Sequence, residues 1–138
     1  MSASTVVVGF GVVGVSVVRQ LLRAGTAPED VVVVDVRQDA VEEATALGVR
    51  ALLGSGTDRA VLAQAAAGAG CVVVAVGEDA AAVLVTMMAR DLCPAAKVHT
   101  VIRDAEHTEQ AKRAGADDVV APEEWVGRLL AFVIRPRS

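Results

Sequence analysis

The sequence predicts an α/β fold in which a doubly wound parallel sheet is followed by one further helix. Short valine-rich runs alternate with alanine-rich segments of helical period along the chain, and this repeated strand–helix alternation is typical of the class. The valine-rich runs are continuously apolar, as strands are when helices cover both faces of a parallel sheet. With right-handed crossovers, the strands take the Rossmann-like order 3-2-1-4-5-6.

The expected elements follow one another without a low-complexity linker. The apolar runs predict strands at Thr5–Val8, Val31–Asp35, Arg50–Leu53, Cys71–Val76, Val98–Ile102 and Asp118–Ala121. Helical spacing predicts helices at Val12–Arg23, Gln38–Leu47, Asp58–Ala66, Asp79–Leu92 and Glu106–Ala114. Side chains that can cap a helix stand at three of the helix starts: Thr57 or Asp58, Asp79 and Asp104. Glycines follow three of the helix ends: Gly25, Gly48 and Gly115.

A last helix is expected to begin at Pro122, because a proline and acidic residues in the first turn favour a helix start. Its apolar residues form one stripe and a second beside it: Val126, Leu129, Leu130, Val133 and Ile134, then Trp125 and Phe132. This surface is too broad for a single contact. We therefore expect the helix to lie against its own domain and also against a partner chain; a helix packed only on the sheet is the alternative.

Composition excludes several classes of protein. A chain of 138 residues with 54% apolar residues can build its own core and is not disordered. Aromatic residues make up 2% and the net charge is −4, which argues against a nucleic-acid-binding surface. Cys71 and Cys93 are expected to be reduced thiols, and His99 and His107 have no neighbouring ligand at zinc-site spacing. No stretch resembles a signal peptide or a membrane span, so we expect a cytoplasmic chain that does not insert into a membrane.

A G-x-G-x-x-G motif spans Gly9–Gly14, directly after the first strand and at the start of the first helix. In such a turn Gly9 permits the tight bend, Gly11 lets the backbone approach a pyrophosphate, and Gly14 lets the helix pack closely on the strand. The start of the helix offers N–H groups and the positive end of its dipole to phosphate. The motif therefore predicts a phosphate-binding turn.

Asp35 supports this prediction, because it ends the second strand about 20 residues after the turn, where a carboxylate can bind both ribose hydroxyls of an adenosine. It would repel a 2′-phosphate, so NAD(H) is favoured over NADP(H), although Arg37 could cover the adenine or contact a phosphate. Loops after the third and fourth strands should complete the pocket, the latter at the topological switch point. Glu78 and Asp79 there could be an acid–base pair, but a solvated loop end and a helix cap are favoured.

The candidate cofactor-binding residues come from four loops. They are Gly9, Phe10, Gly11, Val12, Val13, Gly14, Asp35, Val36, Arg37, Gly54, Ser55, Gly56, Thr57, Ala75, Val76, Gly77 and Glu78. No catalytic or metal-ligating residue is expected. We divide the chain into a Rossmann-type nucleotide-binding domain at 1–121 and a helix segment at 122–138.

Several motifs resemble those of the regulator of potassium conductance domain, also called the RCK, KTN or TrkA-N domain. They are the Gly9–Gly14 turn, Asp35, the Gly54–Thr57 turn leading to Leu62, Cys71–Asp79, Ala89–Leu92 and the run Arg113–Pro122. The last run is unlike the usual continuation of a dehydrogenase. The resemblance covers about 85% of the chain and is greatest to cytoplasmic domains of bacterial potassium channels.

The resemblance implies a nucleotide-sensing domain that controls potassium channel gating or potassium uptake. Its ligand would be NAD(H), or else ADP, ATP or AMP. The helix from Glu123 would be a crossover helix that builds a homodimer or gating ring through Trp125, Val126, Leu129, Leu130, Phe132 and Val133. A membrane subunit of a potassium channel or transporter would be the second partner. The family's usual C-terminal ligand-binding lobe is expected to be missing from these residues, and Val12 stands where the family often has an arginine.

Two other functions remain open at this stage. An NAD-dependent oxidoreductase fragment would need a substrate domain and a proton donor, and the chain has no tyrosine. An assembly module with a degenerate pocket would keep the turn only for packing. Binding of a nucleotide separates the sensor from the assembly module, and hydride transfer would identify the oxidoreductase.

Overall fold

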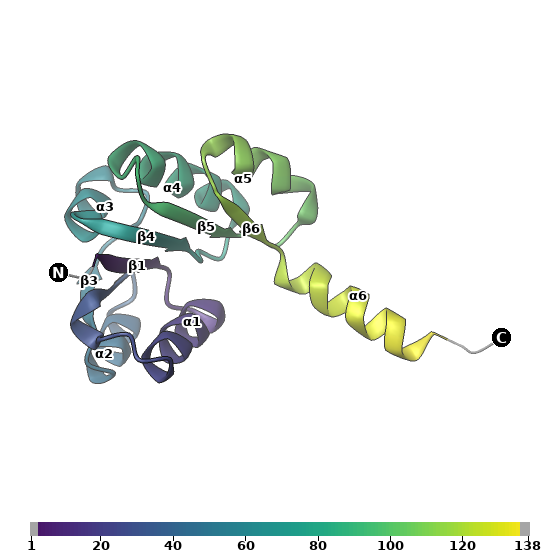
Figure 1. The fold of residues 1–138 in the computed structure, drawn as a ribbon, viewed down its shortest axis with the longest axis horizontal. Helices are drawn as coiled ribbons and strands as arrows, with labels where there is room; N and C mark the ends of the chain where they lie inside the picture. Colours follow the sequence, from purple (N-terminus) through teal and green to yellow (C-terminus); the bar gives the residue numbers. More distant parts are fainter. Residues whose placement is uncertain (1–2, 136–138) are drawn as a thin grey trace.

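The computed structural model describes residues 3–135 and contains a single parallel sheet in the order β3-β2-β1-β4-β5-β6 (Figure 1). The strands are β1 (Ser4–Val8), β2 (Val31–Asp35), β3 (Arg50–Leu53), β4 (Ala69–Val74), β5 (Lys97–Val101) and β6 (Asp118–Val120). The helices are α1 (Val12–Arg23), α2 (Gln38–Ala46), α3 (Arg59–Ala66), α4 (Asp79–Leu92), α5 (Thr108–Ala114) and α6 (Pro122–Ile134). Short 3-10 turns precede β2 (Pro28–Asp30) and α5 (Ala105–His107). The predicted Rossmann-like fold class is confirmed.

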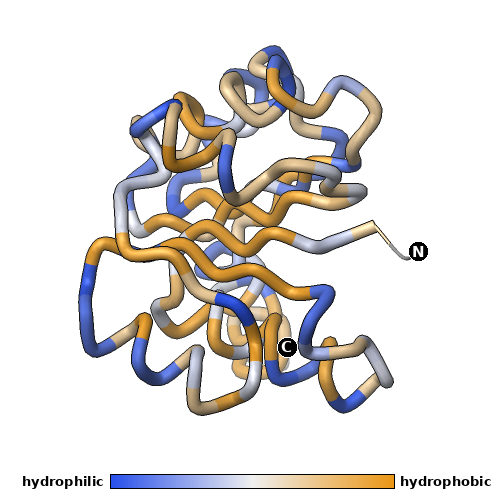
Figure 2. The backbone as a smooth tube through the Cα atoms, turned by 90° about the vertical axis from the view of Figure 1, so that its left-hand side faces the viewer, coloured by the Kyte–Doolittle hydropathy of each residue, from blue (hydrophilic) through white to orange (hydrophobic). Residues whose placement is uncertain are grey.

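Helices cover both faces of the sheet, and this explains the continuous apolar runs. Helices α1 and α2 lie on one face and α3, α4 and α5 on the other (Figure 1). Within each central strand the side chains alternate between the two layers, so Val7 packs towards α1 and α2 while Val6 and Val8 pack towards α3 and α4. The central strands are accordingly hydrophobic along their whole length (Figure 2). All five residues of β2 are buried.

The chain reverses its winding direction between β1 and β4, which lie side by side. Val6 is opposite Val72 and Val8 is opposite Val74 in the parallel register. Beyond these pairs, the N–H of Ala75 donates to the carbonyl of Val8 at 2.8 Å, and both strands then end. Their connections leave in opposite directions across the sheet, and this arrangement opens a crevice at the carboxyl edge of the strands.

Some predicted boundaries are wrong. Strand β4 ends at Val74 rather than Val76, because the chain leaves the sheet at the switch point although its residues remain apolar. The segment predicted as a helix from Glu106 begins as a 3-10 turn capped by Asp104, whose carboxylate accepts the N–H of Glu106 at 2.9 Å. Asp58 caps α3 as expected, accepting the N–H of Ala60 at 3.0 Å. The three glycines expected after helix ends all have positive φ: Gly25, Gly48 and Gly115.

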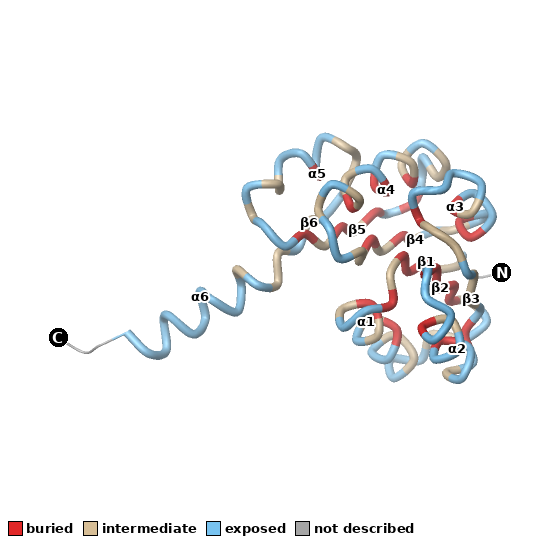
Figure 3. Tube along the Cα trace, turned by 180° about the vertical axis from the view of Figure 1, so that it is seen from behind, coloured by how far each residue is buried: buried red, intermediate tan, exposed pale blue. Residues whose placement is uncertain are grey.

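Helix α6 extends away from the rest of the domain (Figure 1), and over its described length, Pro122–Ile134, no residue is buried (Figure 3). The expectation that it packs on its own domain is wrong, and so is the alternative of packing only on the sheet. Its apolar side chains are exposed, with Trp125 at 71% and Phe132 at 67%. The helix begins directly after the short edge strand β6, and none of the elements described within residues 3–135 buries its apolar face.

The division of the chain at residues 121 and 122 remains a prediction. No helix in the part of the chain that the structure describes combines the length and apolarity needed to cross a membrane.

Candidate functional site

The crevice at the switch point is a cavity of about 820 Å³. It lies at the carboxyl ends of the strands and is lined by Val8, Gly9, Phe10, Gly11, Val12, Val13, Val34, Asp35, Val36, Arg37, Gly54, Ser55, Gly56, Thr57, Ala75, Val76, Gly77, Glu78, Ala81, Val101, Ile102, Arg103, Pro122 and Glu123. Its volume is within the range of small-molecule and cofactor sites. The fold therefore brings the loops of both halves of the sheet to one cavity.

The structure places every predicted site residue except Gly14 on the cavity wall. Six lining residues from the second half of the domain were not predicted: Ala81, Val101, Ile102, Arg103, Pro122 and Glu123. Ala81 lies in the first turn of α4, Val101 ends β5, and the other four follow β5 or β6. The carboxyl ends of these strands lie at the same edge as those of β1 and β4. That rule of parallel sheets was the available signal, since no motif marks these positions.

The glycine turn is shaped by close backbone contacts. Gly9 has φ of +100°, and a Cβ there would lie 2.4 Å from the carbonyl oxygen of Ala75. A Cβ on Gly14 would lie 2.0 Å from the carbonyl oxygen of Gly9, so α1 crosses β1 with no room for a side chain. Gly14 therefore belongs to the helix–strand packing and does not line the cavity.

Gly11 is different, because a Cβ there would meet nothing within 4 Å. It is the N-cap residue of α1 and has no side chain with which to cap the first turn. The N–H groups and the positive dipole end of α1 therefore face the cavity. The side chain of Val12 beside them is 90% exposed. This geometry suits an anion that approaches the backbone closely.

Asp35 is the last residue of β2, and its carboxylate holds the Gly9–Gly14 turn through a backbone hydrogen bond. One carboxylate oxygen accepts the N–H of Phe10 at 2.8 Å, and the other accepts the N–H of Arg37 at 2.9 Å. The Nε of Arg37 lies 3.3 Å from the same carboxylate, and its NH2 group donates to the carbonyl of Phe10 at 3.1 Å. Asp35 thus ties the loop after β2 to the glycine turn. A ribose hydroxyl would have to use the remaining lone pairs of this carboxylate or displace the half-exposed Arg37 side chain.

These contacts lower the pKa of the Asp35 carboxyl. Burial by itself would raise the pKa of this carboxyl, but the hydrogen bonds from the backbone of Arg37 and Phe10 and from the Arg37 guanidinium outweigh it. The pKa of Asp35 therefore lies below its ordinary value of 3.8. An ionised carboxylate at this position accepts hydrogen bonds and donates none.

The loop after β3 forms the wall beside the first half of the sheet. Gly56 lies against β1, since a Cβ there would be 2.3 Å from a side-chain methyl of Val8. The Ser55 and Thr57 hydroxyls are 2.6 Å apart, and the N–H of Thr57 donates to the Ser55 oxygen at 3.1 Å. These small residues keep the cavity open above β1 and β2.

Asp79 does not cap its own helix, contrary to the prediction. The N-cap residue of α4 is Glu78, and the Asp79 carboxylate instead accepts the backbone N–H groups of Arg103 at 2.7 Å and Asp104 at 3.0 Å. His107 Nδ1 lies 2.7 Å from the same carboxylate. The loop after β5 needs partners for these N–H groups, and Asp79 is the acceptor that the fold brings next to them. Asp79 therefore anchors the loop that carries Arg103 to the cavity.

The Asp79–His107 contact makes stability depend on pH. The hydrogen bond to Asp79 raises the pKa of His107, so this contribution is complete below the ordinary histidine value of 6.5 and is lost as the pH rises through the raised value. Burial would raise the pKa of Asp79, but the hydrogen bonds from His107, Arg103 and Asp104 lower it below 3.8, so its contribution is lost as the pH falls through the lowered value. The anchor is strongest between pH 3.8 and 6.5.

We expect the stability lost in His107→Gln to be larger at about pH 5.5 than at about pH 9. The measurement is urea unfolding of the variant and the wild type at both values. His99→Gln, which removes the chain's other histidine, is the control. Equal losses at the two pH values would contradict an ionic Asp79–His107 contact.

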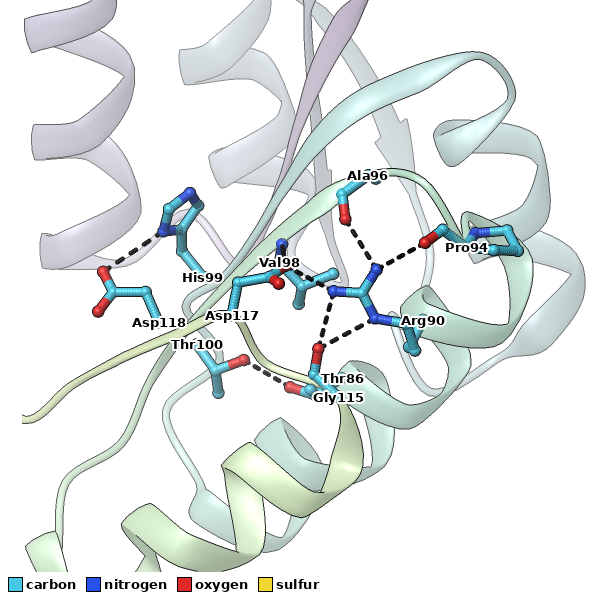
Figure 4. A network of polar contacts seen from close by, with 10 residues as sticks. All are labelled: Thr86, Arg90, Pro94, Ala96, Val98, His99, Thr100, Gly115, Asp117 and Asp118. Atoms are coloured by element: carbon cyan, nitrogen blue, oxygen red, sulfur yellow. Dashed lines mark hydrogen bonds and ion pairs between the residues drawn. The ribbon is translucent and has the colours of Figure 1, made fainter.

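A polar network centred on Arg90 holds α4 to the segment before β6 (Figure 4). Its guanidinium donates to the carbonyls of Gly115 at 2.8 Å and 3.0 Å and of Ala96 at 2.8 Å, and it pairs with Asp117 at 2.5 Å. Asp117 also accepts the N–H of Val98 at 2.8 Å. Two of the motifs that carry the family resemblance, around Arg90 and around Gly115, thus meet in one structural contact away from the cavity.

Neither a metal-ligand cluster nor a disulfide is present among the described residues. Residues 3–135 contain no cluster of three His, Cys, Asp or Glu side chains that could hold a metal ion. Cys71 and Cys93 form no disulfide in the structure, and the Cys93 thiol donates to the carbonyl of Ala66 at 3.4 Å. Burial raises the pKa of both, and Arg90 offsets part of this effect at Cys93. The candidate site is the cavity at the switch point, with the start of α1 on its wall.

Comparison with protein families identifies the chain. The model of the TrkA-N domain matches residues 5–122. The chain belongs to the TrkA-N domain family. The resemblance inferred from the sequence motifs is therefore confirmed.

Known proteins share this domain with the chain. The Ktr system potassium uptake protein C of Bacillus subtilis (strain 168) is 30% identical over 139 residues, which cover 97% of this chain and 60% of that protein. This TrkA-N chain thus spans about 60% of the length of the curated relative that it matches.

Solved structures show the same fold. The TrkA-N domain of the inner membrane protein YbaL from Escherichia coli superposes with a TM-score of 0.86 at 23% identity, covering 98% of both chains. The GsuK channel bound to NAD matches with a TM-score of 0.82 at 23% identity over 95% of this chain and 23% of that one. GsuK bound to ADP matches with a TM-score of 0.78 at 25% identity over 95% of this chain and 34% of that one.

Proposed function

We propose that this TrkA-N domain is a nucleotide-sensing regulatory domain that controls a potassium channel or a potassium uptake system. The observation that carries the proposal is the cavity at the switch point. Gly11, where a Cβ would meet nothing within 4 Å, and the start of α1 line one part of this cavity, and Asp35 at the end of β2 lines another. The Bacillus subtilis relative is a potassium uptake protein, and GsuK is a channel with NAD-bound and ADP-bound structures.

The favoured ligand is NAD(H), with ADP, ATP or AMP as the alternatives. Its pyrophosphate would contact the backbone of the Gly9–Gly14 turn, and its adenosine would lie over β1, β2 and β3 with the ribose near Asp35. The cavity continues past β4 to the ends of β5 and β6, so it has space for the second half of a dinucleotide. Binding rather than catalysis is proposed, because the wall presents an anion-binding turn and ion-paired side chains.

Regulation requires that the ligand bind one arrangement of the assembly better than another, since equal affinity shifts no equilibrium. A tenfold preference per site supplies about 1.4 kcal/mol. Helix α6 would transmit this preference, because its first residues line the cavity and its apolar face is exposed for a second copy of the chain. The proposed assembly is a cytoplasmic homodimer or ring attached to a potassium-transporting membrane subunit.

The test is to identify nucleotides that remain bound through purification by mass spectrometry, and to measure the affinity of the stripped protein for NAD+, NADH and ADP. Asp35→Ala is expected to lower adenine-nucleotide affinity about tenfold or more. It removes the proposed ribose acceptor and leaves the Phe10 N–H without its carboxylate partner, which also costs about 1–3 kcal/mol of stability.

Glu29→Ala is the matched control. It removes one exposed carboxylate from the 3-10 turn before β2, at the opposite end of the strand that Asp35 closes. We expect its affinity for nucleotides to equal that of the wild type. If the wild type binds none of these nucleotides at millimolar concentration, the sensing function is refuted and an assembly module remains. If Asp35→Ala binds as tightly as Glu29→Ala, the ribose assignment is wrong.

A further inference from the structure

The Asp35 carboxylate already accepts four hydrogen bonds from its own chain. An ionised carboxylate has two oxygens, which together accept about four such bonds. Oδ2 accepts the N–H of Phe10 at 2.8 Å and an N–H of Arg37 Nη2 at 3.5 Å. Oδ1 accepts the backbone N–H of Arg37 at 2.9 Å and its Nε–H at 3.3 Å. No acceptor position of Asp35 is therefore left for the hydroxyl groups of a ligand.

The two backbone donors and the two guanidinium donors differ in how readily they leave the carboxylate. Phe10 is 1% exposed, so its N–H would be buried without a partner if it lost Asp35. The guanidinium contacts are the longer ones, and the Arg37 side chain is 52% exposed while that of Asp35 is 8% exposed. Water can therefore solvate a displaced guanidinium. A competitor for this carboxylate would replace the Arg37 side chain and leave the backbone donors in place.

The Arg37 guanidinium also joins two walls of the cavity. Its Nη2 donates to the Phe10 carbonyl at 3.1 Å, which connects the loop after β2 with the Gly9–Gly14 turn. Asp35, Arg37 and Phe10 all line the cavity. A molecule that enters the cavity thus meets the carboxylate together with the cation that occupies it.

We propose that Arg37 is an autoinhibitory residue, because its guanidinium occupies the acceptor positions of Asp35 that a ribose needs and has to be displaced before a ribose binds. The inference rests on the proposed nucleotide-sensing function and deepens it. The class of ligand is a nucleotide that carries free 2′- and 3′-hydroxyls. The exchange at the carboxylate is one for one, since two O–H donors replace the Nε–H and one Nη2–H.

The displacement lowers the affinity for every ligand that uses Asp35. The pKa of the Asp35 carboxyl lies below 3.8, so it is ionised at neutral pH and attracts the cation. A neutral hydroxyl forms a weaker bond to this carboxylate than a guanidinium does. Because Arg37 is half-exposed, the loss is of the modest size typical of such ion pairs. A ribose therefore takes the carboxylate only when other parts of the same ligand, such as its phosphates, are bound as well.

The test compares ADP with 2′,3′-dideoxy-ADP, which has the same base and phosphates and no ribose hydroxyls. Isothermal titration calorimetry gives the ratio of the two affinities for the wild type and for Arg37→Met, which keeps a long apolar side chain without donors or charge. Loss of the cation changes the affinity for both anions alike and cancels in the ratio. We expect the ratio in favour of ADP to be about fivefold larger in Arg37→Met than in the wild type.

Arg103→Met is the matched control. It removes the same charge from another part of the cavity wall, where the Arg103 Nε lies 3.3 Å from Glu123 Oε1. Its effect on the two anions cancels in the same way, so the ratio should equal that of the wild type. A rise as large as in Arg37→Met would show that loss of charge changes the ratio, and it would overturn the inference.

A measurement without ligand follows the Asp35–Arg37 contact itself. The pKa of the Asp35 carboxyl, followed by NMR, should rise in Arg37→Met, because the carboxylate loses the hydrogen bonds and the charge of the guanidinium. An unchanged pKa would show that the guanidinium does not occupy the carboxylate, and it would overturn the inference.

The remaining outcomes separate the two proposals. An unchanged affinity ratio in Arg37→Met would show that Arg37 does not compete with the ribose. A lower ratio would show that the guanidinium binds the ribose hydroxyls instead. Either result overturns autoinhibition while nucleotide sensing stands. If neither the wild type nor Arg37→Met binds an adenine nucleotide at millimolar concentration, both proposals fail.

Discussion

Replacing Gly14 by alanine is expected to destabilise the domain severely. The new Cβ would lie 2.0 Å from the carbonyl oxygen of Gly9 and 3.0 Å from its carbon, both backbone atoms. Helix α1 cannot move away without opening the apolar layer of Val7 and Val18 beneath it. The expected loss is on the order of 4 kcal/mol, a large share of the roughly 5–15 kcal/mol of a typical domain. Urea unfolding followed by circular dichroism measures it.

Gly11→Ala separates packing from ligand binding within the same motif. A Cβ on Gly11 meets nothing within 4 Å, so the cost should be only that of alanine at an N-cap, about 1 kcal/mol or less. The methyl group occupies the space through which a pyrophosphate would approach the backbone. We expect this variant to fold and to bind adenine nucleotides at least about tenfold more weakly.

Two results would contradict the expectations for Gly14→Ala and Gly11→Ala. A Gly14→Ala protein as stable as Gly11→Ala would show that α1 does not cross β1 as closely as the structure has it. Normal nucleotide affinity in Gly11→Ala, with intact folding, would place the phosphates somewhere other than this turn.

Leu130→Asp is expected to convert the proposed dimer into monomers. Leu130 is 53% exposed and belongs to the apolar stripe of α6 that also contains Val126, Leu129, Val133 and Ile134. If a second copy covers this face, the substitution buries an unpaired carboxylate in the interface, which is strongly unfavourable. We expect the dissociation constant of the dimer to rise by about 100-fold or more. Light scattering after size-exclusion chromatography measures the mass across a concentration series.

Ala131→Asp is the matched control, because it adds the same charge to an exposed position on the face that carries Glu124, Gly127 and Arg128. It should leave the mass unchanged. The sheet domain of both variants should keep its unfolding free energy, since α6 buries no residue against it. A wild-type chain that is monomeric at high concentration would refute the self-association proposal directly.

Periodicity predicted the strands and helices well where local sequence and tertiary contacts agree. Val31–Asp35 is a strand in both sequence and structure, because a run of five buried residues fits only the centre of a covered sheet. The end of β4 was wrong for the opposite reason. Val76 is as apolar as the residues before it, but the neighbouring strand β1 ends at Val8, and the last hydrogen bond to it is donated by Ala75.

The candidate site could be predicted in its first half and not in its second. Gly9–Gly14 and Asp35 are close in sequence to the turn they build, and their spacing carries the information. Arg103 and Glu123 meet across 20 residues of chain, and neither belongs to a recognisable pattern. Asp79 was expected to cap α4, yet the N–H groups of Arg103 and Asp104 compete for its carboxylate once the fold brings them there.

The amino-acid sequence alone determined the sheet order, the position of the glycine turn and the apolar stripe of α6, since each depends on residue type and spacing along a short segment. Only the tertiary structure decided that α6 projects from the edge strand β6, that Gly14 belongs to packing rather than to the cavity wall, and that Arg103 faces Glu123. These features depend on which backbone groups and side chains meet after the strands have paired. Such distant contacts leave no local pattern in the chain.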